Sequence, residues 1–189
     1  FDLFLLNAQK EVVASSEDGQ TGQPGDLPAE AFRLKHLEQA TYLIVIKAAG
    51  ATRAVTFDLF ALDGLIEFPS SPYSLGTPGD ARGSLTVGAV RWDTEELEAF
   101  SSQGPTSDGR LKPEIVAPDR VTTQSYAPDS FPGTSAAAPH VAGAAALVLS
   151  AFPDFSPDEV RSYLTAHALD LDVAGPDTAT GFGGLALPD

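Results

Sequence analysis

The chain has 189 residues, enough to bury a substantial core, and its 43% hydrophobic and 20% charged content is ordinary for a folded protein. Its formal net charge of −15 argues against affinity for nucleic acid, because the sequence offers no basic patch to neutralise phosphates. The absence of cysteine excludes disulfides and thiolate metal sites. The longest apolar run, Val141 to Leu149, is shorter than a bilayer-spanning helix, so we expect no membrane helix.

Residues 1–68 carry the pattern of short β-strands. The candidate strands FDLFLL, EVVASS, TYLIVIK and AVTFDLFAL are rich in β-branched and aromatic residues and partly alternate. Turn-forming stretches separate them, among them the loop from Glu17 to Pro28. The pattern predicts a partial antiparallel β-sandwich or jelly-roll-like domain over residues 1–68. Because Phe1 opens on what looks like the middle of a strand, we expect the chain to be part of a longer protein.

Residues 69–189 mix strands with helices. SLTVGAV (Ser84 to Val90) and PEIVAP (Pro113 to Pro118) are candidate buried strands. A helix is predicted from about Ser135 to Ala151, and a second begins at Ser156 with a capping box and proline at its first position. The apolar positions of the second helix recur at helical spacing as far as Leu171. This mixture favours an α/β layered domain.

The helix starting at Ser135 is apolar on nearly all sides, so we expect it to be buried. Ser135 lies at its amino end, where free N–H groups and the positive end of the dipole would stabilise a developing oxyanion. Pro139 cannot donate to the carbonyl of Ser135, and Gly133 lets another chain come close. From the helix start alone, a simple N-cap serine is the favoured interpretation.

The full string GTSAAAPHVAG resembles the serine motif of the subtilases, the subtilisin-like serine peptidases. LTVGAV, FSSQGPT, LKPEIVAPD, SPDEVRSYL and TGFGGL resemble later subtilase segments in the same order. The resemblance covers about residues 72–189 and implies an α/β, partial subtilisin-like fold with a mostly parallel sheet and helices. Asp119 is a departure, because the family usually has glycine after Ala-Pro.

The resemblance implies roles for particular residues. Ser135 would be the nucleophile, and its backbone N–H would be one oxyanion donor. Gly133 and Thr134 would help bind substrate, together with Ser101 and Ser102 in the loop Ser101 to Asp108, a candidate cleft lining.

None of the three histidines has the His-Gly-Thr context of the subtilase base. His140 is turned about 140° and lies about 7.5 Å along the helix from Ser135, so it cannot reach the serine oxygen. In its Pro-His-Val context it resembles the structural histidine of the family. His167 is expected to be a satisfied core histidine, and His36 has no motif around it. The orienting Asp and the Gly-Asn oxyanion motif are also missing. In the family all three absent elements precede the serine, so we expect them in a missing N-terminal part of the peptidase domain, and we expect residues 1–189 alone to be inactive.

The segments FDLFLLNAQKEVVASS, ATYLIVIK and FDLFAL resemble the β-sandwich of the bacterial pre-peptidase C-terminal type. The resemblance implies an inserted accessory domain with a binding or stabilising role. Its aromatic residues Tyr42, Phe57 and Phe60 are expected in the core.

The leading hypothesis is a secreted serine endopeptidase acting on protein or peptide substrates, with no cofactor for the chemistry and no nucleic-acid or membrane partner. Calcium is common in subtilases, but no EF-hand-like spacing is present, so no ligand is assigned. One alternative is a non-catalytic binding or scaffold protein on a degenerate subtilase fold. Another is that the sandwich docks a substrate or partner and the peptidase part is regulatory. The intact Gly-Thr-Ser favours the enzyme.

Overall fold

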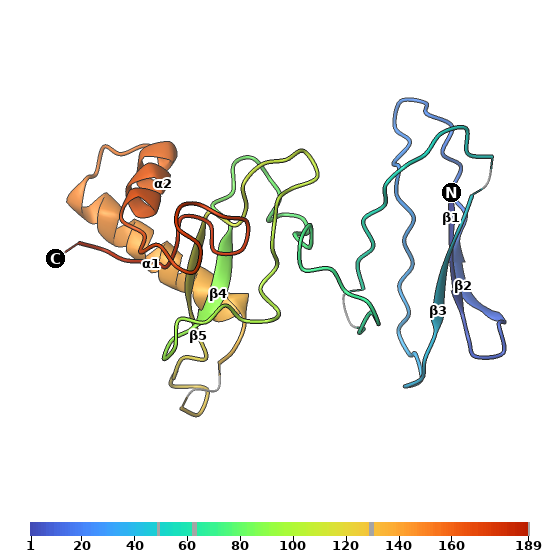
Figure 1. Ribbon diagram of the computed structural model, residues 1–189, viewed down its shortest axis with the longest axis horizontal. Coiled ribbons are helices and arrows are strands. Elements are labelled where there is room, and N and C mark those ends of the chain that lie inside the picture. Colours follow the sequence, from blue (N-terminus) through green and yellow to red (C-terminus); the bar gives the residue numbers. More distant parts are fainter. Residues whose placement is uncertain (49, 62–63, 129–130, 189) are drawn as a thin grey trace. The chain divides into compact units, whose positions relative to one another are not determined.

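The computed structural model describes residues 1–48, 50–61, 64–128 and 131–188 (Figure 1). The chain forms two compact units, unit 1 over Phe1–Phe57 and unit 2 over Asp58–Asp189. The division falls before the predicted domain boundary at residue 68. The assignment of residues 1–68 as an inserted domain stays a prediction.

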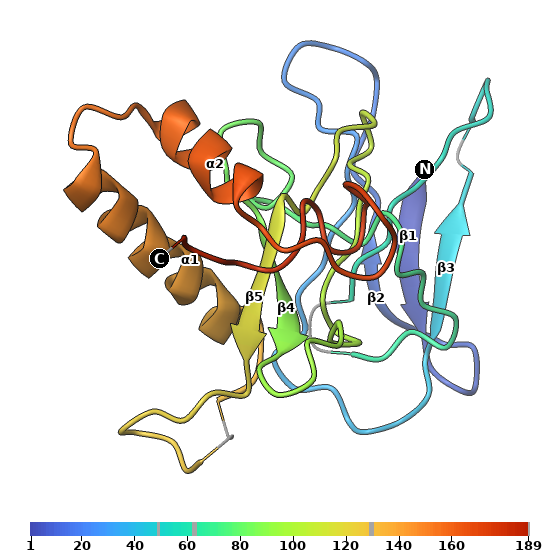
Figure 2. The ribbon, with the colours of Figure 1, turned by 60° about the vertical axis from the view of Figure 1, so that its left-hand side comes forward.

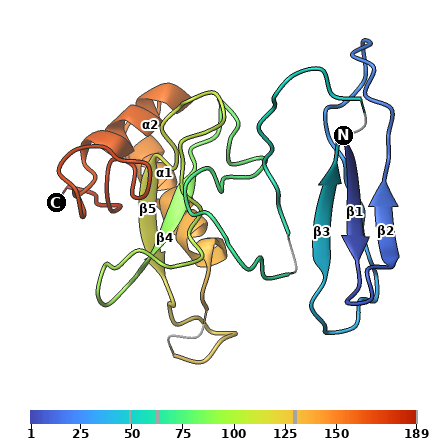
Figure 3. The same ribbon diagram turned by 45° about the vertical axis from the view of Figure 1, so that its right-hand side comes forward.

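Unit 1 contains a three-stranded antiparallel sheet in the order β2-β1-β3 (Figure 3). Its strands are β1 (Asp2–Leu6), β2 (Val12–Ser16) and β3 (Leu43–Lys47). Asn7 shapes the β1–β2 turn, because its side-chain oxygen accepts hydrogen bonds from the backbone N–H groups of Gln9 (3.0 Å) and Glu11 (2.9 Å). Three of the four predicted strands are therefore confirmed.

The fourth predicted strand, AVTFDLFAL, is wrong for its described residues, 54–61, which form no strand. Alternation marks a segment that could lie in a sheet, but it supplies no partner strand. Phe57 and Phe60 are exposed, not in a core, and Tyr42 is half-buried. Leu5 is the only buried hydrophobic residue among the described part of unit 1. The described residues of unit 1 form one sheet, whereas a sandwich needs two, so the β-sandwich stays a prediction.

Unit 2 is built on two parallel strands, β4 (Val87–Arg91) and β5 (Ile115–Asp119). The C-terminal segment runs along the other edge of β5: Gly183 accepts from the Val116 N–H at 3.0 Å, and Leu185 donates to the Val116 carbonyl at 2.8 Å. The buried strands SLTVGAV and PEIVAP were predicted correctly in type and place. Ile115, Val116 and Ala117 have no exposed surface.

Two helices complete unit 2. Helix α1 (Thr134–Ala151) packs on β4 and β5, and α2 (Pro157–Ala166) packs on α1 (Figure 2). The predicted capping box is present, since the Ser156 hydroxyl accepts from the Glu159 N–H and the Glu159 carboxylate accepts from the Ser156 N–H. Helix α2 ends at Ala166, earlier than the apolar spacing predicted, because His167 adopts the C-cap position.

The expectation that α1 is buried on all sides is wrong for the described chain. Five of its residues are buried: Ala136, Ala137, Val141, Ala144 and Val148. On the remaining surface Leu147 is 62% exposed, because β4, β5 and α2 contact one side of the helix. Within the described ranges α1 is also the one helix long and apolar enough to cross a membrane by length and composition alone. Its buried side belongs to the core cluster of unit 2.

Candidate active site

The start of α1 presents Ser135. Gly133 is the N-cap, with φ 109° and ψ 163°, a conformation open essentially only to glycine. Its carbonyl accepts from the N–H groups of Ala136 (2.8 Å) and Ala137 (3.3 Å) and so begins the helix. Ser135 is therefore the second helical residue, and its side chain is exposed. The N-cap interpretation of Ser135 is wrong, because Gly133 occupies that position.

The electrostatics at this helix end suit a developing negative charge. The first turn of a helix leaves N–H groups without intrahelical acceptors, and the helix dipole is positive there. The first turn of α1 contains no acidic residue. The N–H groups of Ala136 and Ala137 use the Gly133 carbonyl, so the N–H of Ser135, which precedes them, is the candidate oxyanion donor at the serine.

The histidines of unit 2 are held by their own helices. His140 Nδ1 lies 2.8 Å from the carbonyl oxygen of Ala136, one turn back along α1. His167 Nδ1 lies 2.8 Å from the Tyr163 carbonyl oxygen, and its ring contacts that of Tyr163 at a tilt of 34°, with the ring centroids 4.2 Å apart. His167 is satisfied, as expected, but it is exposed and not in the core, since α2 ends before it. His36 is an exposed residue of unit 1.

The predicted substrate-binding residues lie in different environments. Thr134 is exposed, and Gly133 and Ser102 are half-buried. Ser101 is buried, and its hydroxyl accepts from the Ala89 N–H of β4 at 3.0 Å. The hydroxyl of Ser101 thus joins its loop to the sheet. Substrate binding by these four residues stays a prediction.

The far end of the candidate cleft loop is fixed by charges. Asp108 accepts from the Thr106 hydroxyl (2.6 Å), from Arg110 Nε (2.8 Å) and from Arg82 Nη2 (2.6 Å). The hydrogen bonds from Arg110 and then Thr106 lower the pKa of Asp108 from its ordinary 3.8 to about 2. The turn after the Gly-Pro-Thr sequence is therefore tied to an ionised carboxylate.

The Asp108→Asn variant is expected to be less stable than the parent protein at pH 7, and the difference should shrink as the pH falls. A folded-state pKa below the unfolded value means that the carboxylate stabilises the fold above about pH 4, and that this contribution is lost between about pH 4 and 2. Urea-unfolding midpoints of both proteins between pH 7 and pH 3 test this. A difference that does not change with pH would contradict it.

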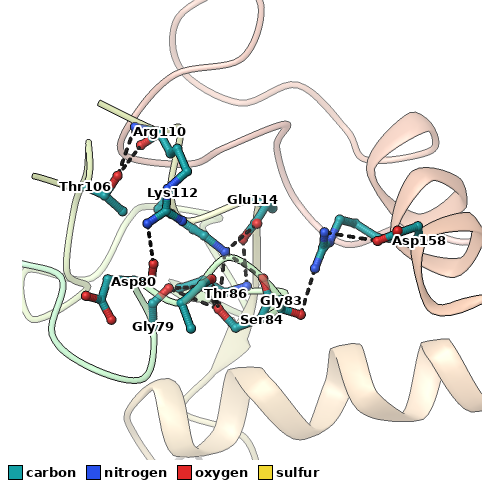
Figure 4. Close-up of polar contacts among 12 residues, drawn as sticks. Gly79, Asp80, Gly83, Ser84, Thr86, Thr106, Arg110, Lys112, Glu114 and Asp158 are labelled. Carbon is teal, nitrogen blue, oxygen red and sulfur yellow. Dashed lines mark hydrogen bonds and ion pairs between the residues drawn. The ribbon is translucent and has the colours of Figure 1, made fainter. Parts of the chain in front are cut away.

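A buried ion pair that the sequence analysis did not identify lies before β5. Lys112 is 2% exposed, and its Nζ donates to the Ser84 carbonyl (2.6 Å) and to Glu114 Oε1 (2.5 Å). The second carboxylate oxygen of Glu114 accepts from the Thr86 N–H at 2.7 Å, and the Thr86 hydroxyl donates to the Gly79 carbonyl (Figure 4). The Lys-Pro-Glu string was the available signal. These contacts join the segment before β4 to the start of β5.

The described residues contain no group of three or more histidine, aspartate or glutamate side chains arranged to hold a metal ion. Structural calcium stays a prediction with no ligand assigned.

Comparisons with known proteins place the chain among serine proteases of one family. A sequence model described as the subtilase family matches residues 10–183. Bacillopeptidase F of Bacillus subtilis (strain 168) is 38% identical over 122 residues, covering 61% of this chain and 8% of that protein. Serine protease AprX of the same organism is 34% identical over 114 residues, covering 48% and 26%. The chain therefore spans about a quarter or less of these relatives.

Solved structures show the same likeness. The CspB protease of Clostridium perfringens is 29% identical, with a TM-score of 0.54 over 63% of this chain and 28% of that one. Together with the mixed α/β architecture of unit 2, this supports a partial subtilisin-like fold. The likeness of residues 1–68 to a pre-peptidase C-terminal sandwich stays a prediction. By the family match and by these relatives, the chain belongs to the subtilase family, the subtilisin-like serine proteases.

Proposed function

We propose that this chain carries the nucleophile of a subtilisin-type serine endopeptidase, with Ser135 forming the acyl-enzyme. The single observation that carries the proposal is the exposed side chain of Ser135 at the second position of α1, directly after the glycine N-cap. Ser135 Oγ attacks the peptide carbonyl, and the hydroxyl proton passes to a general base. The Ser135 N–H stabilises the oxyanion that forms, and the same proton then goes to the leaving amine.

The general base, its orienting aspartate and the oxyanion asparagine belong, in this proposal, to a preceding part of the peptidase domain. The proposal is supported by the hydrogen bonds that hold His140 and His167 on their own helices, and by the lack of a subtilase base context around any histidine. Residues 1–189 alone are expected to lack triad catalysis.

The substrates are proteins or peptides, as the family implies. The enzyme acts outside the cell; a relative from Serratia marcescens, 46% identical over 57 residues, is named an extracellular serine protease. The chemistry needs no cofactor, and we expect neither nucleic acid nor a membrane as partner.

Fluorophosphonate labelling of the full-length native protein tests the proposal, with the modified peptide mapped by mass spectrometry. We expect modification at Ser135 and its loss in Ser135→Ala. Ser150, an exposed serine near the other end of α1, supplies the matched control, because Ser150→Ala should label normally. Folded protein that does not react would instead favour the non-catalytic binding or scaffold hypothesis.

A further inference from the structure

A buried carboxylate lies beside the turn that carries Ser135. Asp119 ends β5 and has no exposed surface. Its Oδ2 accepts a hydrogen bond from the backbone N–H of Gly133 at 2.8 Å. Among the described residues, its other oxygen, Oδ1, is buried without a hydrogen-bond partner. A carboxylate fully withdrawn from water needs a compensating role, because burying its charge costs several kcal/mol, order of magnitude.

Two charged side chains, Glu98 and Arg120, lie close to Asp119. Arg120 is engaged with Glu98, since its Nε contacts Glu98 Oε1 and its Nη2 lies 3.3 Å from Glu98 Oε2. The Arg120 guanidinium holds the pKa of Glu98 below its ordinary value. Asp119 lies close to both members of this pair, and its side chain acts on the pKa of Glu98 and on that of Arg120. The Asp119 carboxyl accepts the Gly133 N–H directly before the first turn of α1, and that turn has no acidic residue of its own.

The hydrogen bond also fixes the geometry of the nucleophile turn. The Gly133 N–H donates to Asp119, and the Gly133 carbonyl accepts from the N–H groups of Ala136 and Ala137. The N–H and the carbonyl of this glycine are therefore both restrained. Its φ of 109° is a value that residues other than glycine rarely adopt. Ser135 follows two residues later, so the direction of its side chain depends on how the chain leaves Gly133.

We propose that Asp119 is a positioning residue for Ser135, which acts by holding the Gly133 N–H and so setting the entry of the chain into α1. The glycine usual after Ala-Pro in the family has no side chain to accept this bond. The departure noted in the sequence thus corresponds to an added anchor. Its catalytic consequence rests on the proposed function, whereas the anchor itself does not.

Three variants of the full-length protein separate the hydrogen bond from the charge. Asp119→Ala removes the acceptor. Asp119→Asn keeps an oxygen acceptor for Gly133 and removes the charge. Asp170→Ala is the matched control, because Asp170 Oδ2 accepts from the Gly175 N–H at the same 2.8 Å at another loop of unit 2.

The first measurement is the rate of inactivation by a fluorophosphonate at increasing reagent concentration. Asp119→Ala is expected to lower the limiting rate constant about 10- to 100-fold, with the half-saturating concentration little changed, because misplacing a reacting group by about 1 Å costs up to roughly 100-fold. Asp119→Asn should stay within about threefold of the parent, and Asp170→Ala should match it. An Asp119→Ala protein with the parental rate constant, or an Asp119→Asn protein as slow as Asp119→Ala, would overturn the proposal.

The second measurement does not need a working active site. Hydrogen exchange of the Gly133 amide, followed by NMR, should be at least about tenfold faster in Asp119→Ala than in Asp119→Asn or the parent protein. If the parent protein does not react with the fluorophosphonate, the proposed function fails and this exchange rate alone decides on the anchor. If Asp119→Ala does not fold, Asp119→Ser replaces it, because the shorter side chain withdraws the acceptor. Unchanged exchange would refute the anchor.

Discussion

Gly183→Ala is expected to destabilise unit 2 by about 3 kcal/mol or more, close to the whole stability margin of many domains. Gly183 has φ 117°, and an added Cβ would lie 1.9 Å from the Leu169 carbonyl oxygen and 2.5 Å from its carbon. Backbone atoms cannot rotate out of the way as a side chain can. Relief of this overlap requires the Gly183 segment to separate from the Leu169 segment, to which Gly184 is joined by two backbone hydrogen bonds of 2.9 and 2.7 Å. Urea unfolding of the full-length protein in a Ser135→Ala background, which avoids self-digestion, gives the change.

Gly175→Ala is the matched control for Gly183→Ala. Gly175 also has a left-handed backbone, with φ 89°, but an added Cβ there meets nothing within 4 Å. Its substitution should cost only the backbone strain, about 1 kcal/mol. Equal losses for the two variants would mean that backbone strain, and not the overlap with Leu169, limits position 183.

Local patterns predicted the elements whose causes lie within a few residues. The capping box at Ser156 and Glu159 forms as expected, because both of its hydrogen bonds join residues three apart. Apolar runs located β4 and β5, since a strand buried on both faces needs no polar alternation. The glycine N-cap of α1 was harder to predict. Serine is a residue type that favours the N-cap position, but the backbone places Ser135 two residues after the N-cap, Gly133.

Features that depend on distant residues were missed or only partly foreseen. The strand pattern of residues 54–61 contained no information on a partner, and the described chain provides none. The apolar surface of α1 predicted burial, but only one side of the helix meets β4, β5 and α2. Periodicity shows that a surface is apolar, and it does not show which part of a protein covers that surface.

The candidate site follows the same division. Ser135 and Gly133 are only two residues apart in sequence, so their string predicted their proximity. Asp119 is 14 residues from Gly133, and only the folded chain shows that its carboxylate reaches the Gly133 N–H. In the sequence Asp119 was visible as a departure from the family motif, and its contact gives that departure a physical meaning.

Lys112→Met is expected to destabilise the protein by about 3 to 5 kcal/mol, because it leaves the Glu114 carboxylate buried without its cation. The side chains of Lys112 and Glu114 are 2% and 12% exposed, and Nζ and Oε1 are 2.5 Å apart. Methionine keeps most of the apolar stem of lysine, so the loss reports on charge more than on packing. Unfolding in urea in the Ser135→Ala background measures it.

The double variant Lys112→Met with Glu114→Gln tests whether the unpaired charge is the cause. In the parent protein the Thr86 N–H donates to Glu114 at 2.7 Å, and glutamine keeps an oxygen that can accept this hydrogen bond. Glutamine has no charge that would be left unpaired. The double variant should therefore recover at least about 1 kcal/mol relative to Lys112→Met, a coupling typical of residues in direct contact. Asp93→Asn, which breaks the more exposed Arg91–Asp93 pair, should have a much smaller effect. A double variant only as stable as Lys112→Met would instead assign the loss to the missing hydrogen bond from Lys112 to the Ser84 carbonyl, which both variants lack.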